Sequence, residues 1–414
     1  MGHTNALLAV ALMALSPPHI WYSYENKVNM MLLLLTVASV WLFWRAGETR
    51  RTNDWIIATS VLIVALFTHS YAVPVAAAIY AWLGWRAIND RSLIKPLFVS
   101  GIVIALAFMP MALMKFGQRS DLGRGYLRQL SAGELYKLAF IWLPSGNTFR
   151  TGNPYGSFAR LIGQPWPYFL IEAFYAFVFL RGLLVVGRRA RGNGWLKRVS
   201  DPATTEPARL ILLWMIMPLS LTLAGSLVSE NFYIERNLLV ILPPFLLLLV
   251  AGSAIESPRW MKSATVAVLV VLAVAATVNL RFFHSETWTV YKFKPDWRSA
   301  VDYLNEDANP ADPPRVLVTV PTYEYRYYQR RNQSGQRLAS KTEPFVYSVC
   351  NDDPENTMRG IAGLGWPDFY LVHNKTWSGC WNEIWNAIPA EPSLQILDQK
   401  EFKGLTIYKF GVKN

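Results

Sequence analysis

Nine runs of apolar residues fill most of the first 280 residues of the chain and constrain its fold more than any other feature. A helix that crosses the hydrocarbon core of a bilayer needs about 20 such residues. Several runs are shorter, so we expect tilted or re-entrant helices in a closely packed bundle. The sequence therefore predicts a polytopic α-helical membrane protein with about nine spans, at residues 4–16, 28–44, 55–68, 71–85, 96–114, 166–187, 210–228, 238–255 and 263–281.

The charges support this prediction and orient the bundle. Only 16% of the residues are charged, against about 25% in soluble proteins. The net charge of +12 comes mostly from every second short loop between the spans, and these loops all lie on one side, as in membrane proteins whose basic loops stay in the cytoplasm. We therefore expect no nucleic-acid partner, although binding of anionic membrane lipids is compatible with the pattern. The basic residues of these loops are Arg45, Arg50, Arg51, Arg86, Arg91, Lys95, Arg188, Arg189, Arg191, Lys197, Arg198, Arg259 and Lys262.

With nine spans, the N-terminus is predicted to lie inside the cell and residues 282–414 outside it. These residues have the composition of a soluble domain. Strands at 314–320 and 368–373 and a C-terminal hairpin, together with a helix at 295–308, predict a small α/β fold. Cys350 and Cys380 either form a disulfide there or remain thiols. We expect no cofactor and no metal, because the sequence lacks a Gly-rich phosphate loop and metal-ligand spacing of its histidines.

The transmembrane domain, residues 1–281, contains one long outer loop at 115–165. Within the loop, residues 131–143 have apolar side chains at helical spacing, and Ser131 with Glu134 forms a capping box. This segment is either an amphipathic helix on the outer membrane surface or a helix packed against the bundle.

Three short segments collect polar and aromatic residues at the predicted outer ends of the helices. The first is SPPHIWYSYENK (16–27), the second FTHSY (67–71) and the third SENFYIERN (229–237), after which Pro243 and Pro244 are expected to break the eighth helix. Ionisable groups near membrane depth are costly and are therefore functional candidates. Together these segments predict a cavity for a phosphate-bearing lipid headgroup, in which Arg236 forks onto phosphate oxygens and Lys27 adds a point charge.

The same segments resemble bacterial membrane glycosyltransferases of the dolichyl-phosphate-mannose–protein mannosyltransferase-like family, which have the GT-C fold. In that family the three segments read like SPFHIWYSQEARMY, THY and RYLLPALP. The tail beginning KPDWRSAVDYL also resembles the start of the family's extracytoplasmic domain. The resemblance covers most of the chain in the right order.

The resemblance implies transfer of a sugar from a polyprenyl-phosphate carrier to an acceptor at the outer face of the inner membrane. By position, Glu25 matches a Glu of the family and is the expected catalytic residue of an inverting-type transferase. The expected substrate-binding residues are Tyr22, Lys27, His69, Tyr233 and Arg236. The chain is a multi-pass inner-membrane protein in this interpretation, with a periplasmic or extracellular C-terminal domain. Its partners are the lipid-linked sugar and membrane lipids, and the sugar and the acceptor are left open.

The chain departs from the family in two respects. It begins near the family's third helix, so we expect the family's N-terminal helices, and the loop carboxylate that acts as catalytic base, to be missing from this sequence. Asn29 and Asn237 also stand where the family often has Tyr. A truncated, non-catalytic membrane scaffold is therefore the alternative function. A lipid flippase or transporter is a third choice, less favoured because the polar groups lie at helix ends rather than at the bilayer midplane.

Overall fold

The computed structural model describes two compact units, Met1–Phe283 and His284–Asn414. The described part of the first unit is helical, and that of the second contains a helix and a mixed sheet. The predicted fold class, a polytopic helical membrane protein with a small C-terminal α/β domain, is thereby confirmed. The residues described are 3–24, 28–117, 131–146, 166–191, 202–228, 235–254, 258–282, 296–307, 315–318, 346–348, 368–374, 385 and 394–412.

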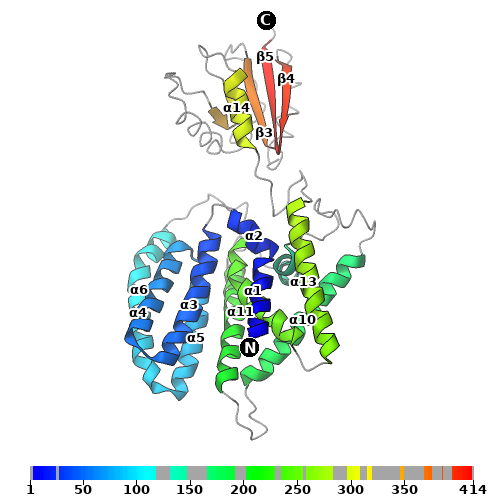
Figure 1. Ribbon diagram of the computed structural model, residues 1–414. Coiled ribbons are helices and arrows are strands. Elements are labelled where there is room, and N and C mark those ends of the chain that lie inside the picture. Colours follow the sequence, from blue (N-terminus) through cyan, green and yellow to red (C-terminus); the bar gives the residue numbers. More distant parts are fainter. Residues whose placement is uncertain are drawn as a thin grey trace. The chain divides into compact units, whose positions relative to one another are not determined.

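Every one of the nine apolar runs falls on helical segments of the first unit (Figure 1). The segments are α1 (His3–Ala14), α2 (Pro17–Tyr24), α3 (Asn29–Thr49), α4 (Thr52–Thr68), α5 (Ala72–Asn89), η1 (Arg91–Leu93), α6 (Ile94–Gly117), α7 (Ala132–Lys137), η3 (Leu138–Trp142), α8 (Leu143–Ser145), α10 (Trp166–Arg191), α11 (Pro202–Val228), η4 (Glu235–Ile241), α12 (Leu242–Ser253) and α13 (Arg259–Phe282).

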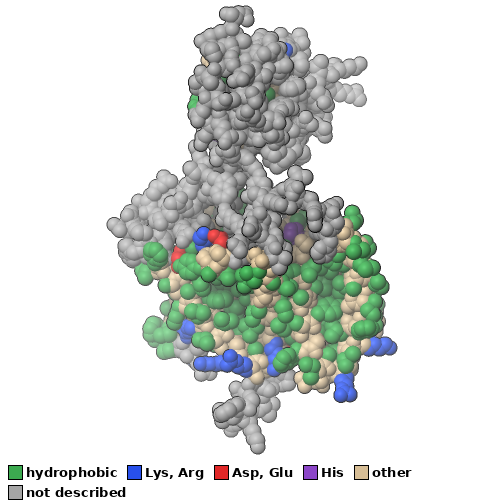
Figure 2. Space-filling view, turned by 180° about the vertical axis from the view of Figure 1, so that it is seen from behind, with side chains coloured by type: hydrophobic (Ala, Val, Ile, Leu, Met, Phe, Trp, Pro, Cys, Tyr) green, Lys and Arg blue, Asp and Glu red, His purple; other side chains and the backbone are tan. Residues whose placement is uncertain are grey.

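Six of these described helices are long and apolar enough to cross a membrane, or seven if the bent pair α1–α2 counts as one span. α4 is a shorter apolar helix. The nine predicted runs are thus all helical, but fewer of them have the length and composition of a full crossing. The surface agrees with a membrane location, because apolar side chains cover the middle of the unit (Figure 2).

The SPPHIWYSYENK segment is helical in its first part, since Pro17 opens the short helix α2, which is bent by 54° from α1. The expected break at Pro243 and Pro244 does not occur within an α-helix. They lie in the first turn of α12, where a missing N–H leaves no hydrogen bond unmade, directly after the 3-10 segment η4.

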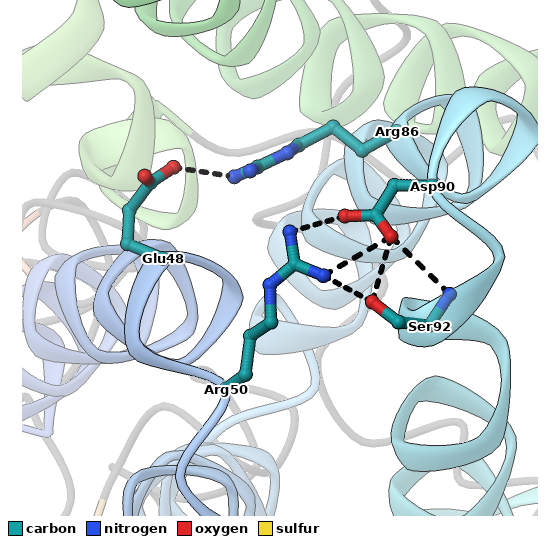
Figure 3. A network of polar contacts seen from close by, with 5 residues as sticks. All are labelled: Glu48, Arg50, Arg86, Asp90 and Ser92. Atoms are coloured by element: carbon teal, nitrogen blue, oxygen red, sulfur yellow. Dashed lines mark hydrogen bonds and ion pairs between the residues drawn. The ribbon is translucent and has the colours of Figure 1, made fainter.

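Charged side chains cross-link the bundle at the end where α3, α5 and α10 finish, which we call the basic end; the opposite end is the polar end. Figure 3 shows the main cluster there. Arg50 adopts a left-handed backbone conformation with φ of 58° as it ends α3, a conformation that costs about 1 kcal/mol or more in a non-glycine residue. Its guanidinium bonds Asp90 at 3.1 Å and also contacts Ser92, and the hydrogen bond from Arg50 lowers the pKa of the Asp90 carboxyl to about 2.

The neighbouring pairs at the basic end likewise join an arginine to a carboxylate. Arg86 of α5 bonds Glu48 of α3 at 2.8 Å, and Arg45 of α3 pairs with Asp54 of α4 at 3.3 Å. Glu206 of α11 accepts from the Trp82 indole at 3.1 Å and pairs with Arg209. These bonds tie α3, α4, α5 and α11 together at one level.

Two glycines let α10 and α12 touch backbone to backbone. A Cβ added at Gly182 would lie 1.9 Å from the carbonyl oxygen of Leu248, and one at Gly252 would lie 1.9 Å from that of Val178. Both distances are far inside van der Waals contact. Inside a membrane the hydrophobic effect does not hold helices together, and small residues at a crossing stabilise it by letting the two backbones pack closely. Phe179 and Phe245 stack beside the crossing, with ring centroids 5.2 Å apart.

The second unit is built on a sheet of order β2-β1-β3-β5-β4. β1 pairs in parallel with its two neighbours, and β3, β5 and β4 pair antiparallel. The predicted hairpin is confirmed, with its turn at Gly404, whose φ is 74°. α14 packs its apolar face on the sheet. The bounds are α14 Trp297–Asp307, β1 Val316–Val318, β2 Val346–Ser348, β3 Asp368–Asn374, β4 Leu394–Phe402 and β5 Leu405–Val412.

One polar cluster ties α14 to this sheet. Asp307 at the end of α14 accepts from the Lys409 ammonium at 2.6 Å and from the Tyr370 hydroxyl. These bonds lower the pKa of the Asp307 carboxyl, and burial together with the Asp307 bond raises the pKa of Tyr370 to about 12. Cys350 and Cys380 lie outside the described residues, so both alternatives for them, a disulfide or two thiols, stay open.

The glycine crossing makes a testable prediction. Gly182→Ala should destabilise the protein by more than the roughly 1–3 kcal/mol of ordinary overpacking, because the methyl group would meet backbone rather than a movable side chain. Gly187→Ala is the control, since nothing lies within 4 Å of a Cβ at that position of the same helix. Thermal unfolding in detergent measures both variants. Equal melting temperatures for the two would contradict the tight crossing.

Candidate active site at the polar end

The turn between α4 and α5 places two of the predicted polar side chains together. His69 ends α4 in an extended conformation, and its Nδ1 accepts a hydrogen bond from the Tyr71 amide at 3.2 Å. The two rings lie 5.8 Å apart. His69 is half-buried and Tyr71 is buried, so the turn holds both side chains against the bundle rather than in solvent.

A second predicted segment, η4, reaches the same place. It carries Arg236 and Asn237 in its first turn and packs against α3, α11 and α12. The phenol of Tyr71 lies within hydrogen-bonding reach of the Asn237 and Thr222 side chains. Arg236, the expected phosphate ligand, is therefore one residue from a polar contact that joins α5, α11 and η4. It is partly exposed.

Several buried polar atoms at the polar end lack a partner in the part of the protein that the structure describes. They include the Asn29 amide nitrogen at the start of α3 and the hydroxyls of Thr222 and Ser226 on α11. The Thr222 hydroxyl lies near Tyr71 but makes no bond of standard geometry. Thr222 and Ser226 are one helical turn apart and share the inward face of α11. Buried groups of this kind usually bond water or a ligand, and all of these are neutral.

The remaining predicted site residues are placed only in part. Tyr22 lies on α2 with 4% of its surface exposed, and its ring is 6.3 Å from that of Trp142. α2 also packs against α3 and α13. Glu25, Lys27 and Tyr233 fall outside the described residues. The structure thus brings two of the three predicted segments into contact, through Tyr71 and Asn237. Tyr22, from the remaining segment, packs against Trp142 instead.

Residues 131–146 form a helical segment that is packed on the bundle by its second half, from Leu138 onward, whereas α7 has no buried residue. The Ser131 hydroxyl accepts from the Glu134 amide at 3.2 Å, as the capping box predicts. After α7 the chain continues as a π-helical turn, η3, and residues 141–146 are buried. The segment contacts α2, α10 and α13. Of the two alternatives for it, the structure favours a helix packed on the bundle.

One carboxylate in this region was not predicted. Glu172 lies on α10, is 8% exposed, and accepts a short hydrogen bond from the Tyr136 hydroxyl of α7. The sequence carried a signal for it, because Glu172 is a lone acid in the apolar stretch FLIEAFYAF. An ionisable residue within a span is a functional candidate by default. Glu172 lies within a span, apart from the three polar segments at the helix ends.

The described residues contain no group of three or more His, Cys, Asp and Glu side chains that could hold a metal ion. At the polar end, the described residues offer a guanidinium, a histidine, a buried carboxylate and several neutral donors and acceptors.

Residues 1–114 match the family model of dolichyl-phosphate-mannose-protein mannosyltransferase. This match confirms the predicted resemblance for that part of the chain, which holds α1 to α6 and includes Tyr22, His69 and Tyr71. It supports a membrane glycosyltransferase of the GT-C type at the level of the family. No curated protein matches the chain. Arg236, Asn237 and Glu172 lie beyond the matched residues.

The contact between Tyr71 and η4 can be tested by hydrogen exchange. Tyr71→Phe should speed exchange of the backbone amides of residues 235–241, because the substitution removes the polar link to Asn237. Tyr80→Phe is the matched control: it removes a 2.8 Å bond to Ser100 from the same helix, away from η4. Unchanged exchange of η4 in Tyr71→Phe would contradict the link.

Proposed function

We propose that the protein transfers a sugar from a polyprenyl-phosphate carrier to an acceptor at the polar end of the bundle. The observation that carries this proposal is the contact between Tyr71 of the His69–Tyr71 turn and Asn237, the residue next to Arg236 in η4. A lipid-linked donor needs a site at the membrane interface that combines a cation for phosphate with hydrogen-bonding groups for sugar hydroxyls. Buried polar atoms of Asn29, Thr222 and Ser226 at the same end supply the second requirement.

Arg236 is suited to the phosphate. Its guanidinium offers parallel N–H donors that match two phosphate oxygens, and it keeps its charge at any physiological pH. Lys27 would add a point charge from the α2–α3 turn, and Tyr22 and Tyr233 would contact the donor. His69 would bind the donor beside Tyr71. As the carbon–oxygen bond to phosphate breaks, negative charge grows on the leaving phosphate, so that these cations stabilise the transition state more than the bound donor.

We propose a single displacement with inversion. The acceptor hydroxyl attacks the anomeric carbon, its proton passes to a carboxylate, and the electron pair of the broken bond leaves on the phosphate. Glu25, two residues before Lys27, is the carboxylate we assign to this step.

The charge distribution supports a location for the reaction. Lys and Arg side chains gather along one edge of the helical unit (Figure 2), and such an edge faces the cytoplasm of an inner membrane. The polar end then faces outward. α13 ends at the polar end, which would place the unit His284–Asn414 in the periplasm or outside the cell.

Arg236→Ala should lower the rate of sugar transfer from a polyprenyl-phosphate-linked mannose by about a hundredfold or more, the usual effect of removing one group that stabilises developing charge. Arg236→Lys should retain part of the activity, since it keeps the charge without the fork. Lys137→Ala is the control, because the Lys137 side chain is half-exposed and its described partner is Glu134 of the same helix. Full activity in a folded Arg236→Ala protein would overturn the phosphate role.

Protease added to sealed, right-side-out spheroplasts should remove the C-terminal unit, because that unit is proposed to lie outside. Digestion of lysed cells serves as the control for cleavability. Complete protection in intact spheroplasts, with cleavage after lysis, would reverse the proposed orientation.

A further inference from the structure

Two carboxylate residues are buried in the part of the chain that the structure describes, and they differ in one respect. Asp54 at the basic end is 8% exposed and is compensated by Arg45 at 3.3 Å and the Thr49 hydroxyl at 2.5 Å. Glu172 is equally buried, but no described cation lies within ion-pairing distance of it. Its partner is the neutral hydroxyl of Tyr136.

The apolar environment of Glu172 makes an unpaired charge at this position unfavourable in free energy. The residue sits on the inward stripe of α10, which continues with Tyr175, Phe179 and Gly182. An ion moved into such surroundings pays several kcal/mol unless it is paired. The other charges near the segment that covers it, Glu134 and Lys137, already bond each other at 2.7 Å. A purely structural role would be served as well by Gln, which keeps the bond from Tyr136 without the ionisation.

The position of Glu172 links it to the candidate active site. It lies in the first turn of the α10 span, which begins near Phe169 at the polar end. Tyr136, which bonds it, is six residues before Trp142 in the same helical segment, or about 9 Å along a helix axis at 1.5 Å per residue. Trp142 packs on Tyr22 of α2. The segment 131–146 therefore connects Glu172 to the helix that leads into Glu25 and Lys27.

We propose that Glu172 and Tyr136 form the binding site for a hydroxyl group of the acceptor. One carboxylate oxygen is held by Tyr136, and the other accepts a hydrogen bond from the acceptor. The ligand class is an amphiphile with a hydroxyl-bearing head, because the site lies at the interface end of a span and the exposed neighbours Phe169 and Leu170 are apolar. This inference rests on the proposed transferase function, for which it names the acceptor side.

The probe is a hydrophobic carbodiimide, which reaches carboxyl groups from the lipid phase. The full chain in lipid nanodiscs is treated with it, and modified peptides are measured by mass spectrometry. Glu172 should be modified and Glu134 should not, because Glu134 is paired with Lys137 outside the span. n-Octyl glucoside below its micellar concentration should slow modification of Glu172 severalfold, whereas n-octyl phosphocholine, which lacks hydroxyl donors, should not.

Two variants complete the test. Glu172→Gln has no carboxyl group to modify, so its binding of octyl glucoside is measured by equilibrium dialysis; it should be about tenfold weaker or worse than that of the wild type, the usual effect of replacing a charged hydrogen-bond acceptor by a neutral one, while the melting temperature stays unchanged. Glu134→Gln should bind as the wild type does. Equal protection by both amphiphiles, or glucoside binding unchanged in Glu172→Gln, would overturn the proposal. If the wild type transfers no sugar from a polyprenyl-phosphate donor but octyl glucoside still protects Glu172, the proposed function is overturned and this binding site stands.

Discussion

The hydrocarbon core of a bilayer offers no hydrogen bonds, and this constraint shapes the whole helical unit. Backbone groups must be satisfied within each helix, so the apolar runs become helices. Ionised side chains move to the two ends, where water and headgroups can solvate them. At the basic end the carboxylates of Glu48, Asp54, Asp90 and Glu206 each meet an arginine. The charges that orient the chain therefore also fasten its helices to one another.

The polar end has the opposite character. Its described contacts between helices are hydrogen bonds, such as Tyr71 with Asn237 and Tyr136 with Glu172, whereas the ion pair of Glu134 with Lys137 lies within one helix. Several buried polar atoms there have no protein partner among the described residues. Salt bridges would lock this end as they lock the other. Neutral donors and acceptors leave it able to exchange one set of hydrogen bonds for another, as a site that binds and releases a polar headgroup requires.

Local patterns predicted what depends on local physics. Hydrophobic periodicity gave the helices, a two-residue turn gave the hairpin at Gly404, and Ser131 gave a cap. The meeting of Tyr71 with Asn237 was predicted only as a shared face of the membrane, because 166 positions separate the two residues and nothing in either segment encodes the packing of α5 on α11. Pro243 and Pro244 were misplaced because proline disrupts a helix interior but suits its first turn. Glu172 was visible in the sequence and could have been found by scanning spans rather than turns.

The crossing of α10 and α12 has a mechanical consequence. With no side chain between the backbones at Gly182 and Gly252, sliding one helix along the other would drive a neighbouring side chain into a carbonyl group. Tilting about the contact keeps the two backbones in touch and displaces only neighbouring side chains such as the stacked rings of Phe179 and Phe245. The crossing is therefore the natural pivot of α10, with Glu172 on one arm of the helix and the arginines at its end, Arg188 and Arg189, on the other. A small tilt of α10 about this point would move its two arms in opposite directions.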